Sequence, residues 1–145
     1  MLRDEVRVGT STPLADPSGD YAYELFDKAA AIVPGAGERL KAKALQLTGG
    51  PDSPQPPEAR SVYAWLMEED RADIFLTYCT NAVLAVEEVP EFRIVNVPPN
   101  LSVGATYGLL VLSDDDAAEA LAETILSEEG QAILARYGFD PPEAE

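Results

Sequence analysis

The sequence contains no histidine and only one cysteine in its 145 residues. Without histidine, neither a Ser-His-Asp nor a Cys-His catalytic group can form, and no imidazole can bind a metal ion. Cys79 on its own can form neither an internal disulfide nor a thiolate zinc site. Since no histidine can activate it, we expect Cys79 to be a small buried thiol. Common routes to nucleophilic catalysis and to metal binding are therefore closed.

Positive charge is also scarce, with 10 Lys and Arg against 26 Asp and Glu and a formal net charge of −16. This imbalance excludes a binder of duplex nucleic acid, whose affinity depends on many exposed cations. It also argues against docking on anionic lipid. It does not exclude one small dianion in a closed cleft, because backbone N–H dipoles act at short range while distant carboxylates are screened over about 8 Å.

Long hydrophobic runs are missing. No apolar stretch approaches the roughly 20 residues of a membrane span, so we expect no membrane insertion. Residues 1–8 (MLRDEVRV) lack the apolar stretch and the cleavage site of a secretory signal, so we expect no signal peptide in this chain. A hydrophobic content of 46% is ordinary for a globular protein, and the length suggests one domain.

Apolar periodicity predicts strands alternating with helices, which indicates an α/β fold. Strands are expected at residues 6–9, 73–78, 92–97 and 107–112. Helices are expected at residues 21–32, 40–47, 62–66, 80–86, 118–125 and 127–137. The strand at 73–78 is apolar enough to be covered on both faces. Ser113 and Asp116 have the spacing of a capping pair for the helix that follows them.

Residues 16–20 (DPSGD) join the first strand to a helix. Ser18 and Gly19 fall at the helix start, where free N–H groups and the positive end of the helix dipole can hold an anion. Gly19 also permits a close approach of the backbone. The alternative is that Ser18 only caps the helix.

Two further places combine polar groups with the end of a predicted element. Residues 57–61 lead into a helix, and Arg60 can aim its guanidinium at an anion held there. In so acidic a chain, the favoured alternative is an ion pair between Arg60 and a nearby carboxylate. Tyr78 and Asn81 follow the carboxyl end of a strand, where ligands of α/β proteins collect. The alternative for Tyr78 is packing, with its hydroxyl in water.

Three stretches carry a resemblance to a known family: residues 8–22 (VGTSTPLADPSGDYA), 73–82 (DIFLTYCTNA) and 126–139 (LSEEGQAILARYGF). In their order and spacing, the chain resembles the molybdate-binding periplasmic proteins of ABC transporters, which have the type II solute-binding fold. The first two stretches are the more specific to this branch. The third occurs widely among solute-binding proteins.

The resemblance implies a type II lobe with a mixed sheet flanked by helices, plus part of the other lobe. Residues 1–98 correspond to the second lobe, and residues 99–145 to the return strand and closing helices of the first lobe, whose N-terminal segment is absent. It also implies that a tetrahedral oxyanion, molybdate or tungstate, is held by hydroxyl and N–H groups rather than by a countercharge. The ligand groups fall on Ser18, Ala59 and Tyr78, and the supporting residues are Gly19, Arg60 and Asn81.

On this reading the chain has no catalytic residue, no metal site and no cofactor besides the bound oxyanion. Its expected partners are an ABC permease and either a second copy of itself or the missing first-lobe segment. Its expected location is the periplasm. Two alternatives stay open: an interaction or regulatory module that keeps the fold without the ligand, and an enzyme such as a carboxylate-based hydrolase.

Overall fold

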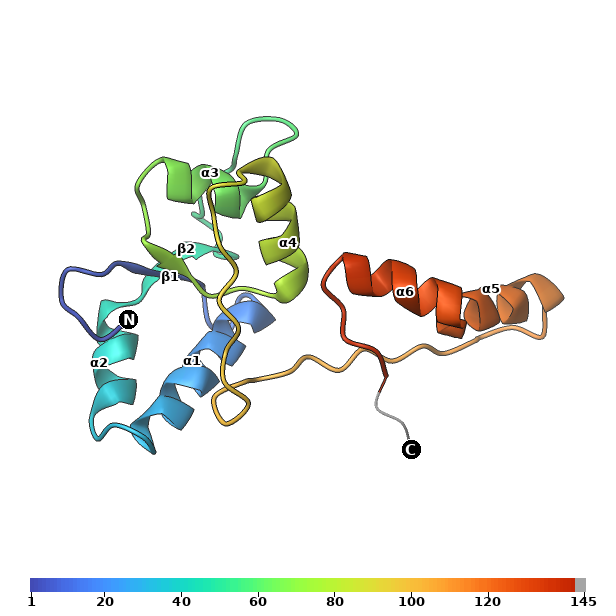
Figure 1. The fold of residues 1–145 in the computed structure, drawn as a ribbon, viewed down its shortest axis with the longest axis horizontal. Helices are drawn as coiled ribbons and strands as arrows, with labels where there is room; N and C mark the ends of the chain where they lie inside the picture. The colour runs from blue at the N-terminus through green and yellow to red at the C-terminus, as the bar shows by residue number, and fades with distance from the viewer. Residues whose placement is uncertain (143–145) are drawn as a thin grey trace. The chain divides into compact units, whose positions relative to one another are not determined.

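The computed structural model describes residues 1–142 and divides into two compact units, Met1–Gly104 and a second that begins at Ala105. Figure 1 shows the helices and strands of both units. The first unit contains β1 (Val8–Ser11), α1 (Pro17–Ala30), α2 (Ala36–Lys43), β2 (Leu45–Thr48), α3 (Val62–Glu68), β3 (Ile74–Phe75) and α4 (Cys79–Glu88). The second contains α5 (Asp116–Leu126) and α6 (Glu128–Arg136).

The described residues form one sheet of three parallel strands in the order β2-β1-β3, so that β1 lies in the centre. The α/β class expected from the sequence is confirmed. The expectation of a mixed sheet is wrong, because both pairings of β1 are parallel. The central strand begins at Val8, two residues later than expected, and β3 covers only Ile74–Phe75 of the predicted 73–78.

The helix expected at residues 40–47 is in fact a helix followed by a strand. Helix α2 ends at Lys43, and Ala44 turns to the extended conformation. Leu45–Thr48 then forms β2 beside β1. Leu47 is buried with Leu66 and Ala72. Its spacing from Leu40 and Ala44 matches a helical period, but it lies in a strand. Local spacing does not distinguish the two in so short a segment.

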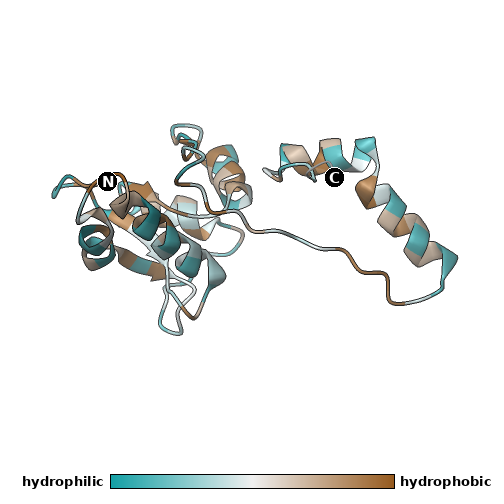
Figure 2. Ribbon diagram, turned by 90° about the horizontal axis from the view of Figure 1, so that it is seen from below, coloured by the Kyte–Doolittle hydropathy of each residue, from teal (hydrophilic) through white to brown (hydrophobic). Residues whose placement is uncertain are grey.

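The strands expected at residues 92–97 and 107–112 are absent. Both segments are irregular, and their apolar side chains face solvent: Val95 is 83% exposed, Leu110 80% and Leu112 88%. In Figure 2 the second segment is brown along much of its length. A strand forms only where a neighbour completes its backbone hydrogen bonds, and neither segment has such a neighbour among the residues of its own unit that the structure describes.

The core of the first unit lies on both sides of the sheet. Val8, Leu25, Phe26 and Leu40 form the cluster under α1 and α2. On the other face, Gly9 is so close to β3 that an added Cβ would lie 2.7 Å from the Phe75 ring. The sheet is therefore a thin layer whose central strand is fully buried.

The second unit is a helix pair without a buried residue in either helix. Gly130 makes the close turn between them possible, because a Cβ there would lie 2.2 Å from the Thr124 carbonyl oxygen. Ser127 caps α6, accepting a hydrogen bond from the Gly130 N–H at 3.1 Å. The cap of α5 is Asp115, which accepts from the Ala117 N–H at 2.9 Å, so the expected pair of Ser113 and Asp116 is wrong.

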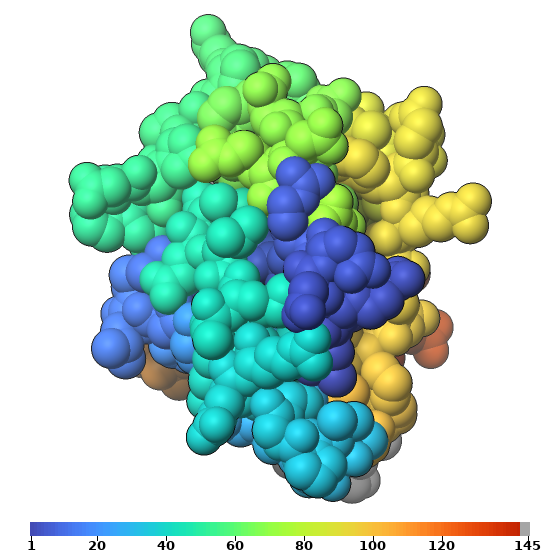
Figure 3. Space-filling view, turned by 90° about the vertical axis from the view of Figure 1, so that its left-hand side faces the viewer, coloured from blue at the N-terminus to red at the C-terminus, as the bar shows by residue number. Residues whose placement is uncertain are grey.

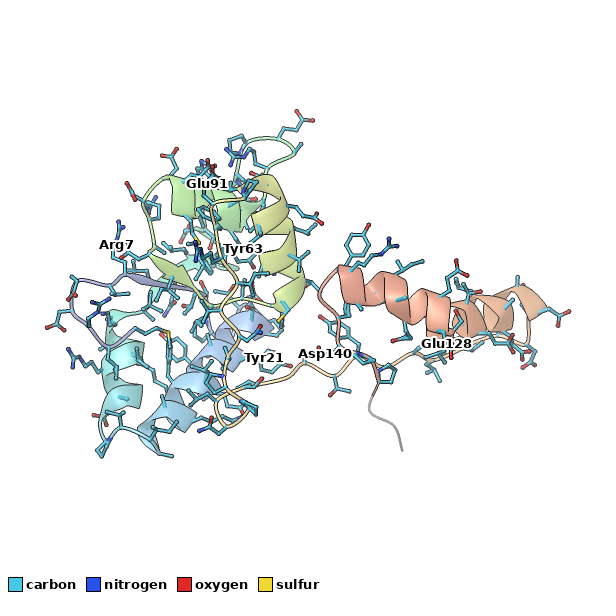
Figure 4. All side chains as sticks on the ribbon, in the orientation of Figure 1. Arg7, Tyr21, Tyr63, Glu91, Glu128 and Asp140 are labelled. Atoms are coloured by element: carbon cyan, nitrogen blue, oxygen red, sulfur yellow. The ribbon has the colours of Figure 1, made fainter. Side chains whose placement is uncertain are left out.

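An ion pair ties the start of β1 to the start of β3. The backbone N–H of Arg7 donates to the Asp73 carboxylate at 2.7 Å, and the Arg7 guanidinium donates to the same carboxylate at 2.6 and 3.1 Å. Arg7 is labelled in Figure 4. These bonds hold the pKa of Asp73 at about 2, below its ordinary value of 3.8, chiefly through the Arg7 side chain.

The Asp73 shift predicts an acid-dependent loss of stability. Because its folded-state pKa is about 2 against 3.8 when free, the Asp73 contribution is present above pH 3.8 and is lost as the pH falls toward 2. We expect Asp73→Asn to lower the urea midpoint at about pH 6, and the difference from the wild type to shrink at about pH 2.5. A difference that does not depend on pH would contradict this assignment.

Thr10, unlike Asp73, is a position where a substitution should stabilise the protein. It is fully buried in β1, and its Oγ1 has no hydrogen-bond partner within residues 1–142. An unsatisfied buried hydroxyl costs about 1–3 kcal/mol, so Thr10→Val should raise the free energy of unfolding by about 1 kcal/mol. The matched control is Ser11→Ala, which removes the buried 2.7 Å hydrogen bond to Thr48 and should destabilise. Urea denaturation measures both, and a destabilised Thr10→Val variant would refute the prediction.

Candidate functional site

The first turn of α1 is closed by the carboxylate that precedes it. Asp16 is the N-cap, and its Oδ1 accepts a hydrogen bond from the Ser18 N–H at 2.9 Å. Ser18 is buried in the first turn, so it is not the cap that the alternative interpretation expected. Gly19 is required by packing, because a Cβ there would lie 2.6 Å from the Thr12 carbonyl carbon. The position predicted to hold an anion is therefore a buried helix start whose Ser18 N–H is bonded to the Asp16 carboxylate.

Tyr78 lies beside this helix start. It precedes the first residue of α4, and its ring meets the Tyr21 ring edge to face, with 6.1 Å between the centroids. Tyr21 belongs to α1, a few residues after Ser18, and is labelled in Figure 4. In Figure 1 the start of α1 and the start of α4 lie next to each other. The structure thus brings together two of the places that the sequence indicated.

The start of α1 and Tyr78 lie at a particular point of the sheet. From β1 the chain passes through α1 and α2 to β2 on one side, and later returns to β3 on the other side. The sheet order therefore reverses between β1 and β3. In open parallel sheets, ligands bind outside the carboxyl ends of the strands at such a reversal. The α1 start follows β1 and Tyr78 follows β3, so both lie at this point.

Asn81 has a positioning role in this structure. Its amide nitrogen donates to the Thr77 hydroxyl at 3.0 Å and to the Tyr63 hydroxyl at 3.2 Å. The Tyr63 ring in turn packs edge to face on Phe75, with 5.0 Å between the centroids. Asn81 therefore fixes the start of α4 against α3 and β3, and both N–H groups of its amide are in use.

Ala59 lies in an exposed turn before α3, with a left-handed backbone (φ 62°). The turn is held by ion pairs. The Arg60 guanidinium contacts the carboxylates of Glu68 and Glu88, as the alternative interpretation of Arg60 expected. Glu88 also accepts a hydrogen bond from the Ser61 N–H at 2.7 Å. That bond, followed by the contact with Arg60, lowers the pKa of Glu88 from its ordinary value of 4.5.

The three predicted ligand positions are thus tied to different ends of α4. Glu88, which holds the Ala59 turn, is the last residue of this 10-residue helix. Tyr78 precedes its first residue. A helix of that length rises by about 15 Å. Ser18 and Tyr78 share one neighbourhood, while the backbone next to Ala59 is anchored at the other end of α4.

Two residues of this region were missed from the sequence, and one was misjudged. Asp16 had a readable signal, since Asp before Pro at a helix start is a typical cap. Glu88 had none, because only the fold brings it to Arg60. Cys79 was expected to be buried and is exposed, since it occupies the first position of α4. Within the described residues, no group of three Asp, Glu or Cys side chains is arranged to hold a metal ion.

A family model for bacterial extracellular solute-binding proteins matches residues 1–140. The chain belongs to this family. It is also 34% identical, over 142 residues, to an uncharacterized protein of Pasteurella multocida (strain Pm70), PM1146. That match covers 97% of this chain and 58% of the relative, so the chain spans little more than half of the relative's length. No solved structure gives a significant match.

Proteins of this family are described as bacterial extracellular solute-binding proteins. The family also favours a binding protein over an enzyme. None of the helices in residues 1–142 has the length and hydrophobicity needed to cross a membrane.

The carboxylate of Glu88 predicts how firmly the turn before α3 is held. The substitution Glu88→Gln removes the negative charge that the Arg60 guanidinium and the Ser61 N–H contact. Opening of the turn should then become about two- to fivefold more frequent, the range expected from exposed ion pairs. Trypsin cleavage after Arg60, followed by mass spectrometry, measures this opening. Glu87→Gln, the exposed neighbour, is the control and should cleave at the wild-type rate.

Proposed function

We propose that this chain contributes to solute capture for an ABC importer by binding a tetrahedral oxyanion of the molybdate or tungstate class. The observation that carries the proposal is the contact of Tyr78 with Tyr21, which sets the Tyr78 side chain beside the buried start of α1. On this proposal the ligand is held by neutral donors: backbone N–H groups at the helix start and the Tyr78 hydroxyl. Such donors, with the helix dipole, stabilise an anion without a countercharge.

The supporting residues have distinct parts in this proposal. Gly19 lets the α1 start pack against the loop after β1, and Asn81 fixes the start of α4. Arg60 is neutralised by Glu68 and Glu88, so it positions the Ala59 turn rather than adding positive charge. Asp16 is the one carboxylate in direct contact with the Ser18 N–H. A bound oxyanion must share or replace that hydrogen bond.

We also propose that the site is completed by further polypeptide. The chain corresponds to 58% of the length of its relative PM1146, and neither helix of the second unit has a buried residue. On this proposal, residues 1–98 form one lobe, and residues 99–145 supply the closing helices of the other lobe and the segment of its return strand, residues 107–112, which is irregular in this structure. The protein would work in the periplasm with a permease, as the family's extracellular role suggests.

The first test is stabilisation by ligand. Millimolar molybdate, tungstate or sulfate should raise the melting temperature of the chain, because a ligand that binds only the folded state stabilises it by mass action. Tyr78→Phe should lower the affinity by about ten- to a hundredfold, the effect of losing one hydrogen bond to a charged group. Tyr107→Phe, at an exposed ring of the second unit, should leave the affinity unchanged.

A second variant at the same site should raise the affinity for the oxyanion instead of lowering it. Asp16→Asn keeps an oxygen that can cap α1 but removes the negative charge, so the oxyanion should bind more tightly than to the wild type. If all three oxyanions leave the melting temperature of both the wild type and Asp16→Asn unchanged, the proposal fails for this chain.

Exposed apolar surface in the second unit predicts self-association. Tyr107, Leu110 and Leu112 are 68%, 80% and 88% exposed, and such surface favours contact with another copy. Light scattering should show a mass that rises with concentration, and Leu110→Asp should reduce that rise. The control is Leu14→Asp, at an exposed loop position of the first unit. A clean monomer at high concentration would count against the prediction.

A second candidate function is supported by one observation. The Ser18 and Ser61 N–H groups are already bonded to the carboxylates of Asp16 and Glu88. In a module that keeps the fold only for contacts with other proteins, the protein's own carboxylates would occupy the N–H groups that otherwise bind an anion. The oxyanion titrations decide between the two functions, because this module would respond neither in the wild type nor in Asp16→Asn.

A further inference from the structure

An open cavity of about 360 Å³, the edge cavity, lies beside β2, an edge strand of the sheet in the described residues. Its lining includes Thr12, Leu47, Gly50, Asp52, Ser53 and Arg71. The volume is within the range of sites for small molecules. In Figure 3 the green segment that follows β2 projects at the outline of the first unit.

One wall of this edge cavity is a fixed turn. The Gly50 N–H donates to the Ser53 hydroxyl at 2.9 Å, and the Ser53 N–H donates back to the Gly50 carbonyl at 3.1 Å. Gly50 also packs against Thr12 so closely that a Cβ would lie 2.8 Å from its Oγ1. The turn that carries Asp52 is therefore held at both its ends and against the strand region behind it.

The lining of the edge cavity also includes Arg71, whose backbone is fixed as well. Its N–H donates to the Leu66 carbonyl at 2.9 Å and so closes the end of α3. In contrast, its guanidinium has no hydrogen bond or ion pair within the described residues, although the chain has 26 acidic side chains. The neighbouring acidic residues Asp70 and Asp73 are engaged by Arg7.

The two charges of the edge cavity do not neutralise each other. Arg71 and Asp52 line the same space, but no ion pair joins them within the part of the chain that the structure describes. A simple anion would gain from Arg71 and be repelled by Asp52, and a simple cation would meet the reverse. A ligand with one charge of each sign gains from both at once.

We propose that the edge cavity is a second binding site, and that it takes a small zwitterion such as an amino acid. The ligand carboxylate pairs with the Arg71 guanidinium, and its ammonium group pairs with the Asp52 carboxylate. The hydroxyls of Ser53 and Thr12, which also line the cavity, add polar contacts. The two proposed sites have no ligand-binding residue in common, although Thr12 of the cavity lining contacts Gly19 and Asp16.

The test is a saturation-transfer NMR titration of the full chain with glycine, β-alanine and 4-aminobutyrate, and with acetate and methylammonium as singly charged probes. At least one zwitterion should bind with a dissociation constant near 1 mM, about tenfold tighter than either singly charged probe. Arg71→Gln and Asp52→Asn should each weaken that binding about tenfold. Both side chains are exposed, so neither change removes core packing.

The matched control is Arg93→Gln, which removes another exposed arginine, outside the cavity lining, and should bind like the wild type. Tyr78→Phe should also bind the zwitterion normally, which separates this site from the proposed oxyanion site. The proposal is overturned if no zwitterion binds below about 20 mM, if acetate binds as tightly as the best zwitterion, or if Arg71→Gln binds like the wild type.

Discussion

The fold depends on how closely other segments approach the central strand. All four residues of β1 are buried, and the strand pairs in parallel on both edges. Gly9 leaves room for the Phe75 ring, and Gly19 lets the start of α1 lie against the loop that follows the strand. A side chain at either position would push a neighbour away. Because both predicted ligand positions near the sheet follow strands β1 and β3, this close packing also places the start of α1 next to Tyr78.

The sequence predicted the α/β class, most helices and the location of α1 and α4, because long apolar periodicities and Pro or Gly boundaries are local signals. It failed where pairing decided the outcome. Leu47 fitted a helical stripe but lies in β2, since a neighbouring β1 offers hydrogen bonds that no local pattern shows. Residues 107–112 have the composition of a buried strand, but they pair with no strand among the described residues. Whether such a segment forms a strand depends on a neighbour that spacing does not encode.

The candidate site was predicted in part for the same reason. Tyr78 and Ser18 could be named as candidates because strand ends and helix starts can be recognised locally, and the fold places Tyr78 beside the helix that Ser18 begins. The hydrogen bonds made by the Asp16 and Glu88 carboxylates were not predicted from the sequence. Asp16 closes the α1 start, and Glu88 closes the turn at Ser61, so in this acidic chain two of the acidic side chains serve as internal anions. Glu88 is 27 residues from Ser61, and a contact at that separation depends on the tertiary structure.

The exposure of Cys79 has a practical consequence. The sequence has no other cysteine, and this one is accessible at the first residue of α4, directly after Tyr78. A thiol-reactive fluorophore would therefore attach at one known position, without prior mutagenesis. Its emission would report changes in polarity around the Tyr21–Tyr78 contact in real time. Cys79, which can form no internal disulfide, thus provides a built-in attachment point for an optical sensor.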